Sequence, residues 1–266
     1  MEKKLFLLDA YALIYRAHFA FINNPRINSK GLNTSAIFGF CNSLLEVINN
    51  HEPTHLGVVF DPPGGSNREE IFTEYKANRQ EMPEDIRKAI PYIFEILKAM
   101  NIQVEMVSGF EADDLIGTLS KQAEKKGFKV FMMTPDKDFG QLVSENIFIY
   151  KPGRSGNPSE ILGPKEVCEK FEVERPEQVI DILGLWGDAV DNIPGIPGIG
   201  EKTAKKLISI YGSIENLLAN KEDLKGKQKE NVENFADQGL ISKKLATIIL
   251  DCPVEFNESI YKRKEI

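Results

Sequence analysis

The chain of 266 residues carries a formal net charge of −7, with 42% hydrophobic and 27% charged residues. This balance predicts a soluble globular protein, with enough chain for one large domain or for a core with an appended lobe. No segment approaches the ~20 apolar residues of a membrane span, and charged residues interrupt the apolar N-terminus, so neither a membrane helix nor a secretory signal is indicated. Three cysteines lie far apart and indicate neither a disulfide framework nor a zinc site. We therefore expect a cytoplasmic protein that is not bound to a membrane; the cysteines are Cys41, Cys168 and Cys252.

Predicted strands and helices alternate along the first 151 residues. Short apolar runs predict strands over 3–9, 55–61, 102–107, 128–134 and 146–151. Helical spacing predicts helices from about residue 11 and over 34–50, 82–101 and 111–127, the third of these with a proline interruption. This order predicts an α/β fold, with a largely parallel central sheet covered by helices on both faces. The strand signals stop at about residue 176, so we divide the chain into an α/β core, 1–175, and a helical region, 176–266.

The connection over residues 61–82 is long and polar. It opens with a Pro/Gly turn and then places Tyr75 among Arg68, Lys76 and Arg79. A connection of this length is usually functional or mobile. Basic residues interleaved with aromatic ones suit contact with nucleic acid, although a solvated amphipathic helix has the same pattern.

Residues 51–55 read His-Glu-Pro-Thr-His and match the H-E-x-x-H signature of zinc proteases. That signature needs both histidines on one face of a helix. Pro53 disfavours a helix at this point, and an apolar strand follows at once. We therefore do not expect a zinc site here.

Acidic residues follow four of the predicted strands. Because the carboxyl ends of parallel strands line one edge of a sheet, these acids should converge in one crevice. Two further acids just before a glycine-rich turn could close the crevice from below. Taken singly, acids such as those at 111–114 also fit ordinary helix caps. The full set is Asp9, Asp61, Glu111, Asp113, Asp114, Asp136, Asp138, Asp188 and Asp191.

So many carboxylates in one place would repel each other unless cations bound them. This interpretation treats the acids as having no His, Cys or Lys beside them, so the site would offer oxygen ligands only. Such a site selects Mg²⁺ or Mn²⁺ and suits two-metal phosphoryl chemistry. Without these nine acids, 31 acidic residues remain against 33 Lys and Arg, so the rest of the protein is slightly basic and compatible with DNA.

The stretch NIPGIPGIGEKTAKKL, residues 192–207, has the glycine spacing of a P-loop, with Gly195 and Gly200 five apart. A P-loop would continue with Lys and then Ser or Thr, whereas here Glu201 follows Gly200. We expect a tight turn between two helices, with free backbone N–H groups that could hold one phosphate, and no nucleotide cofactor. An ordinary interhelical turn would have the same composition.

Several of these stretches together resemble the bacterial 5′ nuclease (flap endonuclease) family, which includes the N-terminal 5′→3′ exonuclease domain of DNA polymerase I. They are FLLDAYALIYRAHFA, VVFDPPGGSNREEIFTEYKANR, GFEADDLIGTL, TPDKDFGQLV and GDAVDNIPGIPGIGEKTAKKL. The resemblance covers nearly the whole chain in the same order. It implies a helical arch over the active site at about 62–82 and a helix-hairpin-helix element at about 185–208.

The resemblance also implies roles for individual residues. Asp9, Asp61, Glu111 and Asp113 would surround a first metal ion, with Asp114 as a direct or water-mediated ligand, and Asp136, Asp138, Asp188 and Asp191 would surround a second. The arch would contribute Arg68, Tyr75, Lys76 and Arg79 to catalysis. The hairpin would hold duplex DNA, often around a potassium ion, through Gly195, Gly198, Gly200, Lys202, Thr203, Lys205 and Lys206.

One stretch departs from the family pattern. The family commonly has a Phe-Arg-His-Glu run where this chain has Asn67-Arg68-Glu69-Glu70, so the arch is less basic at its start. The departure concerns how the arch handles a DNA strand and leaves the metal acids untouched.

The expected reaction is Mg²⁺- or Mn²⁺-dependent hydrolysis of DNA at a 5′ flap or 5′ end, leaving a 5′-phosphate and a 3′-hydroxyl, in replication and repair. We expect a monomer or a part of a DNA polymerase I chain. Two alternatives stay open at this point: a branched-DNA binding module without catalysis, and a different Mg²⁺-dependent nuclease on a related fold.

Overall fold

The computed structural model describes residues 2–153 and 158–264. In them the chain forms a six-stranded sheet with the strand order β3-β2-β1-β4-β5-β6. Five strands are parallel, and β6, which the sequence analysis did not predict, pairs antiparallel with β5 at the edge. The mostly parallel α/β prediction is therefore confirmed. The strands are β1 (Lys4–Asp9), β2 (His55–Val59), β3 (Gln103–Glu105), β4 (Lys129–Met133), β5 (Ile147–Lys151) and β6 (Glu160–Leu162).

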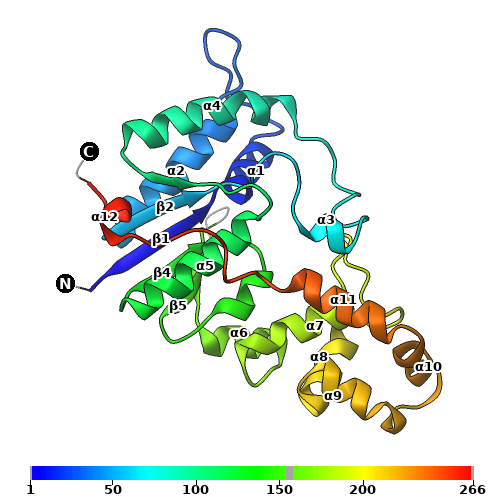
Figure 1. The fold of residues 1–266 in the computed structure, drawn as a ribbon. Coiled ribbons are helices and arrows are strands. Elements are labelled where there is room, and N and C mark those ends of the chain that lie inside the picture. The colour runs from blue at the N-terminus through cyan, green and yellow to red at the C-terminus, as the bar shows by residue number, and fades with distance from the viewer. Residues whose placement is uncertain (1, 154–157, 265–266) are drawn as a thin grey trace.

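One face of the sheet is covered by α1 (Ala10–Ala20), α2 (Ser35–His51) and α4 (Glu84–Ala99) (Figure 1). Phe6 and Leu8 of β1 point into this layer and are fully buried. Contrary to the predicted interruption, α4 continues through Pro91. Pro91 is exposed, so water can satisfy the carbonyl that loses its partner there.

The other face is covered by α5 (Ala112–Lys125), whose buried side chains pack on Leu5 and Leu7 of β1. The same apolar cluster runs on into the helical region, to residues such as Ile182 and Ile208. The core and the helical region therefore share one continuous hydrophobic core, which fixes the second part of the chain against the first.

The helical region forms a smaller body beside the sheet (Figure 1). In it α7 (Val179–Trp186) and α11 (Ala236–Ala246) pack closely. A Cβ on Gly184 of α7 would lie 3.0 Å from the Cα of Lys243 of α11, so the absence of a Cβ on glycine allows this close approach. The helices after β5 are α6 (Pro164–Phe171), α7 (Val179–Trp186), α8 (Glu201–Tyr211), α9 (Ile214–Ala219), α10 (Gly226–Asn234), α11 (Ala236–Ala246) and α12 (Glu258–Tyr261). The short 3-10 turns are η1 (Asp138–Leu142), between β4 and β5, and η2 (Pro176–Gln178) and η3 (Lys221–Asp223), after β6.

Residues 247–264, here called the C-terminal strap, leave the helical region and return across α5 to β2 (Figure 1). Thr118 of α5 donates its hydroxyl to the carbonyl of Ile249 at 3.2 Å, and Tyr261 donates to Glu105 at 2.7 Å. The backbone N–H of Arg263 donates to the carbonyl of Thr54 at 2.9 Å. The sequence analysis assigned this segment to the helical region, and these hydrogen bonds attach it to α5 and to the edge of the sheet in the α/β core.

Candidate active site

The predicted strand-end acids do lie at the carboxyl edge of the sheet, next to the switch in strand order between β1 and β4. Asp9 ends β1 and caps α1, because its Oδ1 accepts a hydrogen bond from the N–H of Ala12 at 3.1 Å. Its Oδ2 accepts the hydroxyl of Thr134, which follows β4, at 3.1 Å. Asp61, after β2, accepts the N–H of Ala112 at 3.0 Å. These bonds bind three strand ends and the start of α5 into one edge.

The start of α5 holds three acids in a fixed arrangement. Glu111 is the N-cap, and Asp114 completes a capping box by accepting the N–H of Glu111 at 3.1 Å. The side chain of Asp113 in turn accepts the N–H of Asp114 at 2.7 Å. The carboxylates therefore stabilise the first turn of the helix, as the capping interpretation expects, and they also stand at the sheet edge.

A second group of acids joins the core to the helical region. Asp136 accepts the N–H of Asp138 at 2.9 Å, and both follow β4. Asp188 and Asp191 come from the loop after α7. Asp138 is only 8% exposed, and its Oδ1 has no hydrogen-bond partner among the residues that the structure describes. A buried carboxylate oxygen without a partner is costly, and a bound cation would satisfy it.

Four cations of the described residues lie directly against these acids, and one of them, Arg68, contacts the acids at the start of α5 and is described below. The Nζ of Lys76 is 2.7 Å from Oε2 of Glu111 and 3.8 Å from Oδ2 of Asp191. An Nη atom of Arg79 lies 2.5 Å from Oδ1 of Asp191. The fourth cation is Lys137, described next.

Lys137 pairs with Asp188, and its Nζ lies 3.3 Å from Oδ1 of Asp138. The interpretation of acids with no lysine beside them was therefore wrong. The signal was present in the sequence, because Lys137 stands between two of the predicted ligands, Asp136 and Asp138. Thr134, which bonds to Asp9, was missed as well.

The segment over residues 62–82 closes against the loop after α7. The N–H of Lys76 donates to the carbonyl of Asp191 at 2.9 Å, and Asn192 donates its side-chain amide to the carbonyl of Glu74 at 2.6 Å. Tyr75 is 4% exposed and donates its hydroxyl to Glu111 at 3.1 Å. Only residues Arg68–Ile71 are helical here, as α3, and they lie against α11 (Figure 1).

Arg68, which the resemblance assigned to the arch, is only 3% exposed. Its guanidinium makes two hydrogen bonds to Asp114, at 2.8 and 2.7 Å, and donates to the carbonyls of Leu245 and Thr247 at 3.0 Å each. In this arrangement Arg68 has no donor turned to solvent for a DNA strand. Asp114, held by Arg68, is 1% exposed, and its carboxylate also accepts the N–H groups of Glu111 and Ile249.

The pKa values of the acids reflect their burial and their neighbouring charges. Burial, followed by the charge of Asp61, raises the pKa of Asp9 to about 7. Burial and then Asp136 raise the pKa of Asp138 to about 7 as well. Burial alone would raise the pKa of Glu111, but Lys76 and Arg68 bring it below its ordinary value. Ionising these buried acids therefore costs free energy, and nearby positive charge reduces that cost.

These residues fit divalent metal ions by their chemistry, because the donors are carboxylate oxygens and one buried carboxylate oxygen has no hydrogen bond within the described residues. Within residues 2–153 and 158–264, however, no three acidic, histidine or cysteine side chains already converge as metal ligands do. Lys76, Arg79 and Lys137 lie against these acids.

The glycine-rich turn lies in the loop between α7 and α8, at residues 187–200. Gly187, Gly195 and Gly198 have φ of 79°, 61° and 78°, which favour glycine. The turn is fixed by α11, because Ser242 accepts the N–H of Gly195 at 3.0 Å and Gln238 donates to the carbonyl of Gly195 at 2.6 Å. Gly200 is the N-cap of α8.

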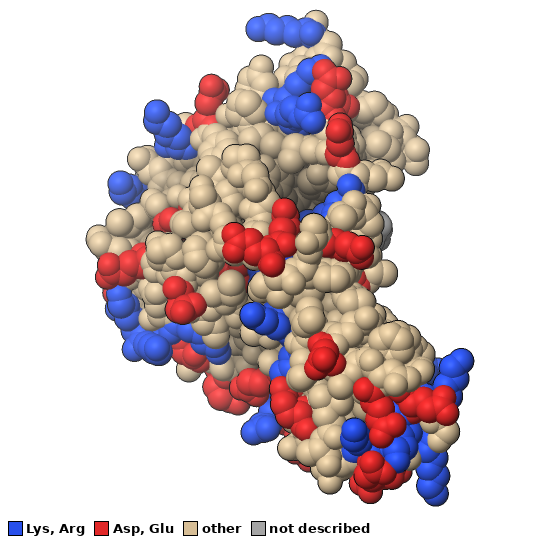
Figure 2. Space-filling view, turned by 45° about the vertical axis from the view of Figure 1, so that its right-hand side comes forward, with Lys and Arg blue, Asp and Glu red and all other residues tan. Residues whose placement is uncertain are grey.

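The lysines after this turn differ in availability. Lys202 and Lys206 are exposed, and neither forms an ion pair with any residue that the structure describes. Lys205 is 11% exposed at its side chain and is engaged by Glu201 at 2.9 Å and by the carbonyl of Lys170 at 2.8 Å. Figure 2 shows Lys and Arg interspersed with Asp and Glu over the face in view, including the helical region. Two of the three predicted lysines therefore stand ready for an outside anion.

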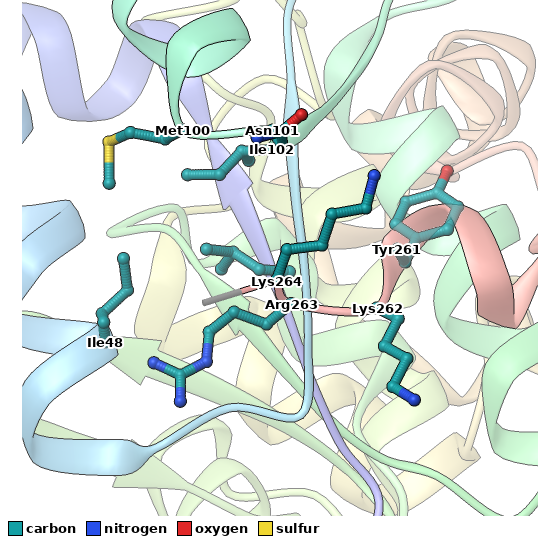
Figure 3. A pocket seen from close by; sticks show the side chains of 9 residues that line it. Ile48, Met100, Asn101, Ile102, Tyr261, Lys262, Arg263 and Lys264 are labelled. Atoms are coloured by element: carbon teal, nitrogen blue, oxygen red, sulfur yellow. The ribbon is translucent and has the colours of Figure 1, made fainter. Parts of the chain in front are cut away.

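A second hollow does not compete with this site. It lies where the strap ends, beside Met100, Ile102 and Arg263 (Figure 3). Its volume is about 10 Å³, roughly the room that one water molecule needs.

No helix in the described part of the chain is long and apolar enough to cross a membrane.

The 5′-3′ exonuclease family models match both parts of the chain. The N-terminal resolvase-like domain matches residues 4–172, and the C-terminal SAM fold matches residues 174–266. The 5′-3′ exonuclease of Aquifex aeolicus is 40% identical over 98% of this chain and 87% of its own length. DNA polymerase I of Bacillus subtilis is 43% identical over 97% of this chain, but the chain spans only 29% of that relative.

Solved structures share the fold at lower sequence identity. A T5 5′-exonuclease with bound zinc has a TM-score of 0.77 at 20% identity, covering 92% of this chain and 89% of that one. The catalytic core of Rad2 with a DNA substrate has a TM-score of 0.63 at 17% identity, covering 99% of this chain and 83% of that one. With family models that match nearly all of its length and a relative of similar length at 40% identity, the chain belongs to the 5′-3′ exonuclease family.

Proposed function

We propose that the protein is a structure-specific 5′ nuclease that hydrolyses DNA at 5′ flaps and 5′ ends with Mg²⁺ or Mn²⁺, in primer or flap removal during replication and repair. The observation that carries this proposal is the edge of the sheet, where the pKa values of Asp9 and Asp138 are raised and the buried Oδ1 of Asp138 has no hydrogen bond within the described residues. Bound cations would reduce the unfavourable repulsion among the acids at this edge. Family membership supports the reaction class.

The acids divide into two groups by the elements that carry them. Asp9, Asp61, Glu111 and Asp113 lie on the ends of β1 and β2 and at the start of α5, and we assign them to one ion. Asp136, Asp138, Asp188 and Asp191 lie between β4 and the loop after α7, and we assign them to the other. Divalent ions held there would supply Lewis-acid chemistry for phosphodiester hydrolysis.

Lys76 and Arg79 would position the DNA strand. Their charges already stand at the junction of the two acid groups, because Lys76 contacts Glu111 and Asp191 together. A phosphate entering this junction would take the two cations from the acids, and Lys76 would then offset negative charge that develops on the phosphate. Tyr75 would position the segment over residues 62–82 through its hydrogen bond to Glu111.

The glycine-rich turn would bind the duplex part of the DNA at a distance from the scissile phosphate. Backbone N–H groups at the start of α8, together with Lys202 and Lys206, can bind phosphates without reading sequence. Binding through these contacts should weaken with salt, and the slope of log Kd against log[salt] should fall by about 1 for each lysine removed. Potassium at the turn is part of the proposal by family resemblance alone.

Cleavage of a 5′-labelled double-flap DNA tests the proposal, run with Mg²⁺, with Mn²⁺ and with a chelator. The expected result is cutting near the flap junction in either metal and none in chelator. Tight flap binding with no cutting in either metal would favour a non-catalytic branched-DNA binding module. Cutting of single-stranded RNA with the flap left intact would favour a different metal-dependent nuclease.

A further inference from the structure

We propose that Lys137 is a built-in counter-cation of the second acid group and competes with a divalent ion for Asp138 and Asp188. This inference rests on the proposed function of those acids. It concerns a residue to which the family resemblance above assigned no role. It also explains how a site with so many carboxylates can fold before any metal ion arrives.

The geometry places the ammonium group of Lys137 between the two parts of the protein. Lys137 directly precedes η1, on the loop after β4. Its Nζ contacts Asp138 of the core at 3.3 Å and pairs with Asp188 of the loop after α7. The same Nζ lies 5.6 Å from the centre of the Trp186 ring, at the end of α7. One cation therefore joins the core to the loop that carries Asp188 and Asp191.

The acids around Lys137 need such a cation. The Oδ1 of Asp138, which lies 3.3 Å from Nζ, has no hydrogen bond within the described part of the chain. Lys137 itself is 28% exposed at its side chain, so its charge is only partly screened by water. The carboxylates of Asp138 and Asp188 both lie against the ammonium group of Lys137 and favour its charged form.

Lys137 differs from Lys76 and Arg79 in its attachment. Lys76 and Arg79 belong to the segment over residues 62–82, which meets the loop after α7 through a few backbone and side-chain bonds. Lys137 lies between Asp136 and Asp138 in the chain and cannot move away with a segment. A divalent ion that takes the same carboxylate oxygens must turn the Lys137 side chain aside. The affinity of the second acid group for a divalent ion is then lower than its carboxylates alone would give.

The test is Mn²⁺ binding in the absence of DNA, followed by electron paramagnetic resonance or calorimetry, for the full chain and for Lys137→Met. The substitution keeps an unbranched side chain that is only one atom shorter, and it removes the charge. We expect the weaker Mn²⁺ sites to tighten by about tenfold, the factor that corresponds to a competing contact of about 1.4 kcal/mol. In chelator, Lys137→Met should unfold at a lower temperature than the wild type, and Mn²⁺ should raise that temperature by more.

Two further variants make the result specific. Lys137→Arg keeps the charge and should bind Mn²⁺ about as weakly as the wild type. Lys88→Met removes an exposed lysine of α4 that pairs with Glu84, away from the acids, and should change nothing. If Lys137→Met does not fold, Lys137→Gln serves with the same expectation.

The outcomes separate this inference from the proposed function. Unchanged or weaker Mn²⁺ binding in the uncharged variants, with normal binding by the wild type, would overturn the role of Lys137 alone. No Mn²⁺ binding by the wild type, or equal binding after Asp138→Asn, would instead overturn the metal site and with it the proposed function. Tightening in Lys137→Met but not in Lys137→Arg or Lys88→Met supports the inference.

Discussion

The guanidinium of Arg68 and the carboxylate of Asp114 form a buried pair with two hydrogen bonds, at 2.8 and 2.7 Å. Asp114 also accepts the N–H of Glu111 and the N–H of Ile249, at 3.1 and 2.8 Å. This pair therefore ties the segment over residues 62–82, the start of α5 and the C-terminal strap to one point. Glu111, a proposed metal ligand, is positioned through it.

Loss of Arg68 should be among the most destabilising single changes in the chain. Arg68→Met leaves the buried Asp114 without its cation, which should cost about 3–5 kcal/mol of unfolding free energy. Arg68→Lys should recover little, because lysine cannot make both bonds to one carboxylate. Denaturant unfolding in chelator measures the effect, with the exposed Arg87→Met as the matched control. A loss for Arg68→Met no larger than that of Arg87→Met would contradict this role.

Lys76→Met should reduce cleavage much more than binding. Lys76 stands at the junction of the two acid groups, where it would offset charge developing on the phosphate, so its removal should lower the single-turnover rate about 100-fold or more. The Kd for flap DNA should change little, since the glycine-rich turn keeps its own phosphate contacts. Lys88→Met serves as the control with a normal rate. A normal rate in Lys76→Met would show that this lysine has no part in the reaction.

Stability in chelator should fall as the pH rises from 6 to 8. The pKa values of Asp9 and Asp138 in the folded protein are about 7, above the ordinary value of 3.8. Groups with raised folded pKa values stabilise the fold when they are protonated, and this contribution is lost as the pH rises through about 7. Mg²⁺ should bind the ionised acids and restore more stability at pH 8 than at pH 6. Thermal unfolding with chelator and with Mg²⁺ at both pH values measures this, and an equal gain at both would speak against it.

Two glycines of the turn make a matched pair. A Cβ at Gly195, where φ is 61°, would lie 2.5 Å from the N of Gly187, so Gly195→Ala should distort the turn and cost about 1–3 kcal/mol or more. Gly200 has a φ of −89°, and a Cβ there would meet nothing within 4 Å. We expect weaker duplex binding and lower thermal stability for Gly195→Ala and little change for Gly200→Ala. Equal behaviour of the two would mean that the turn does not determine binding.

The sheet and its acidic edge could be predicted because they depend on local signals. Apolar runs and helical spacing predicted five of the six strands, and the rule that parallel strands end at one edge placed Asp9 and Asp61 together. The strand β6 was missed, since its three residues are partly exposed and carry no alternation. The continuity of α4 through Pro91 was missed as well, because it depends on which side of the helix faces water.

Long-range contacts were beyond the reach of the sequence patterns. Arg68 reads as one of several exposed basic residues until Leu245 and Thr247 close over it from 177 and 179 positions away. The C-terminal strap has no strong periodicity, and its place is set by hydrogen bonds to α5. Lys137 is the exception, because its position between two acids was visible in the sequence.

The most direct test of the central claim compares Asp136→Asn with Asp251→Asn on a 5′-labelled double flap in Mg²⁺. Asp136 belongs to the second acid group, whereas Asp251 is an exposed acid of the strap. Cleavage near the junction should be lost in Asp136→Asn, with flap binding retained, and should be normal in Asp251→Asn. Full cleavage by Asp136→Asn would show that the acids at this edge do not carry the reaction.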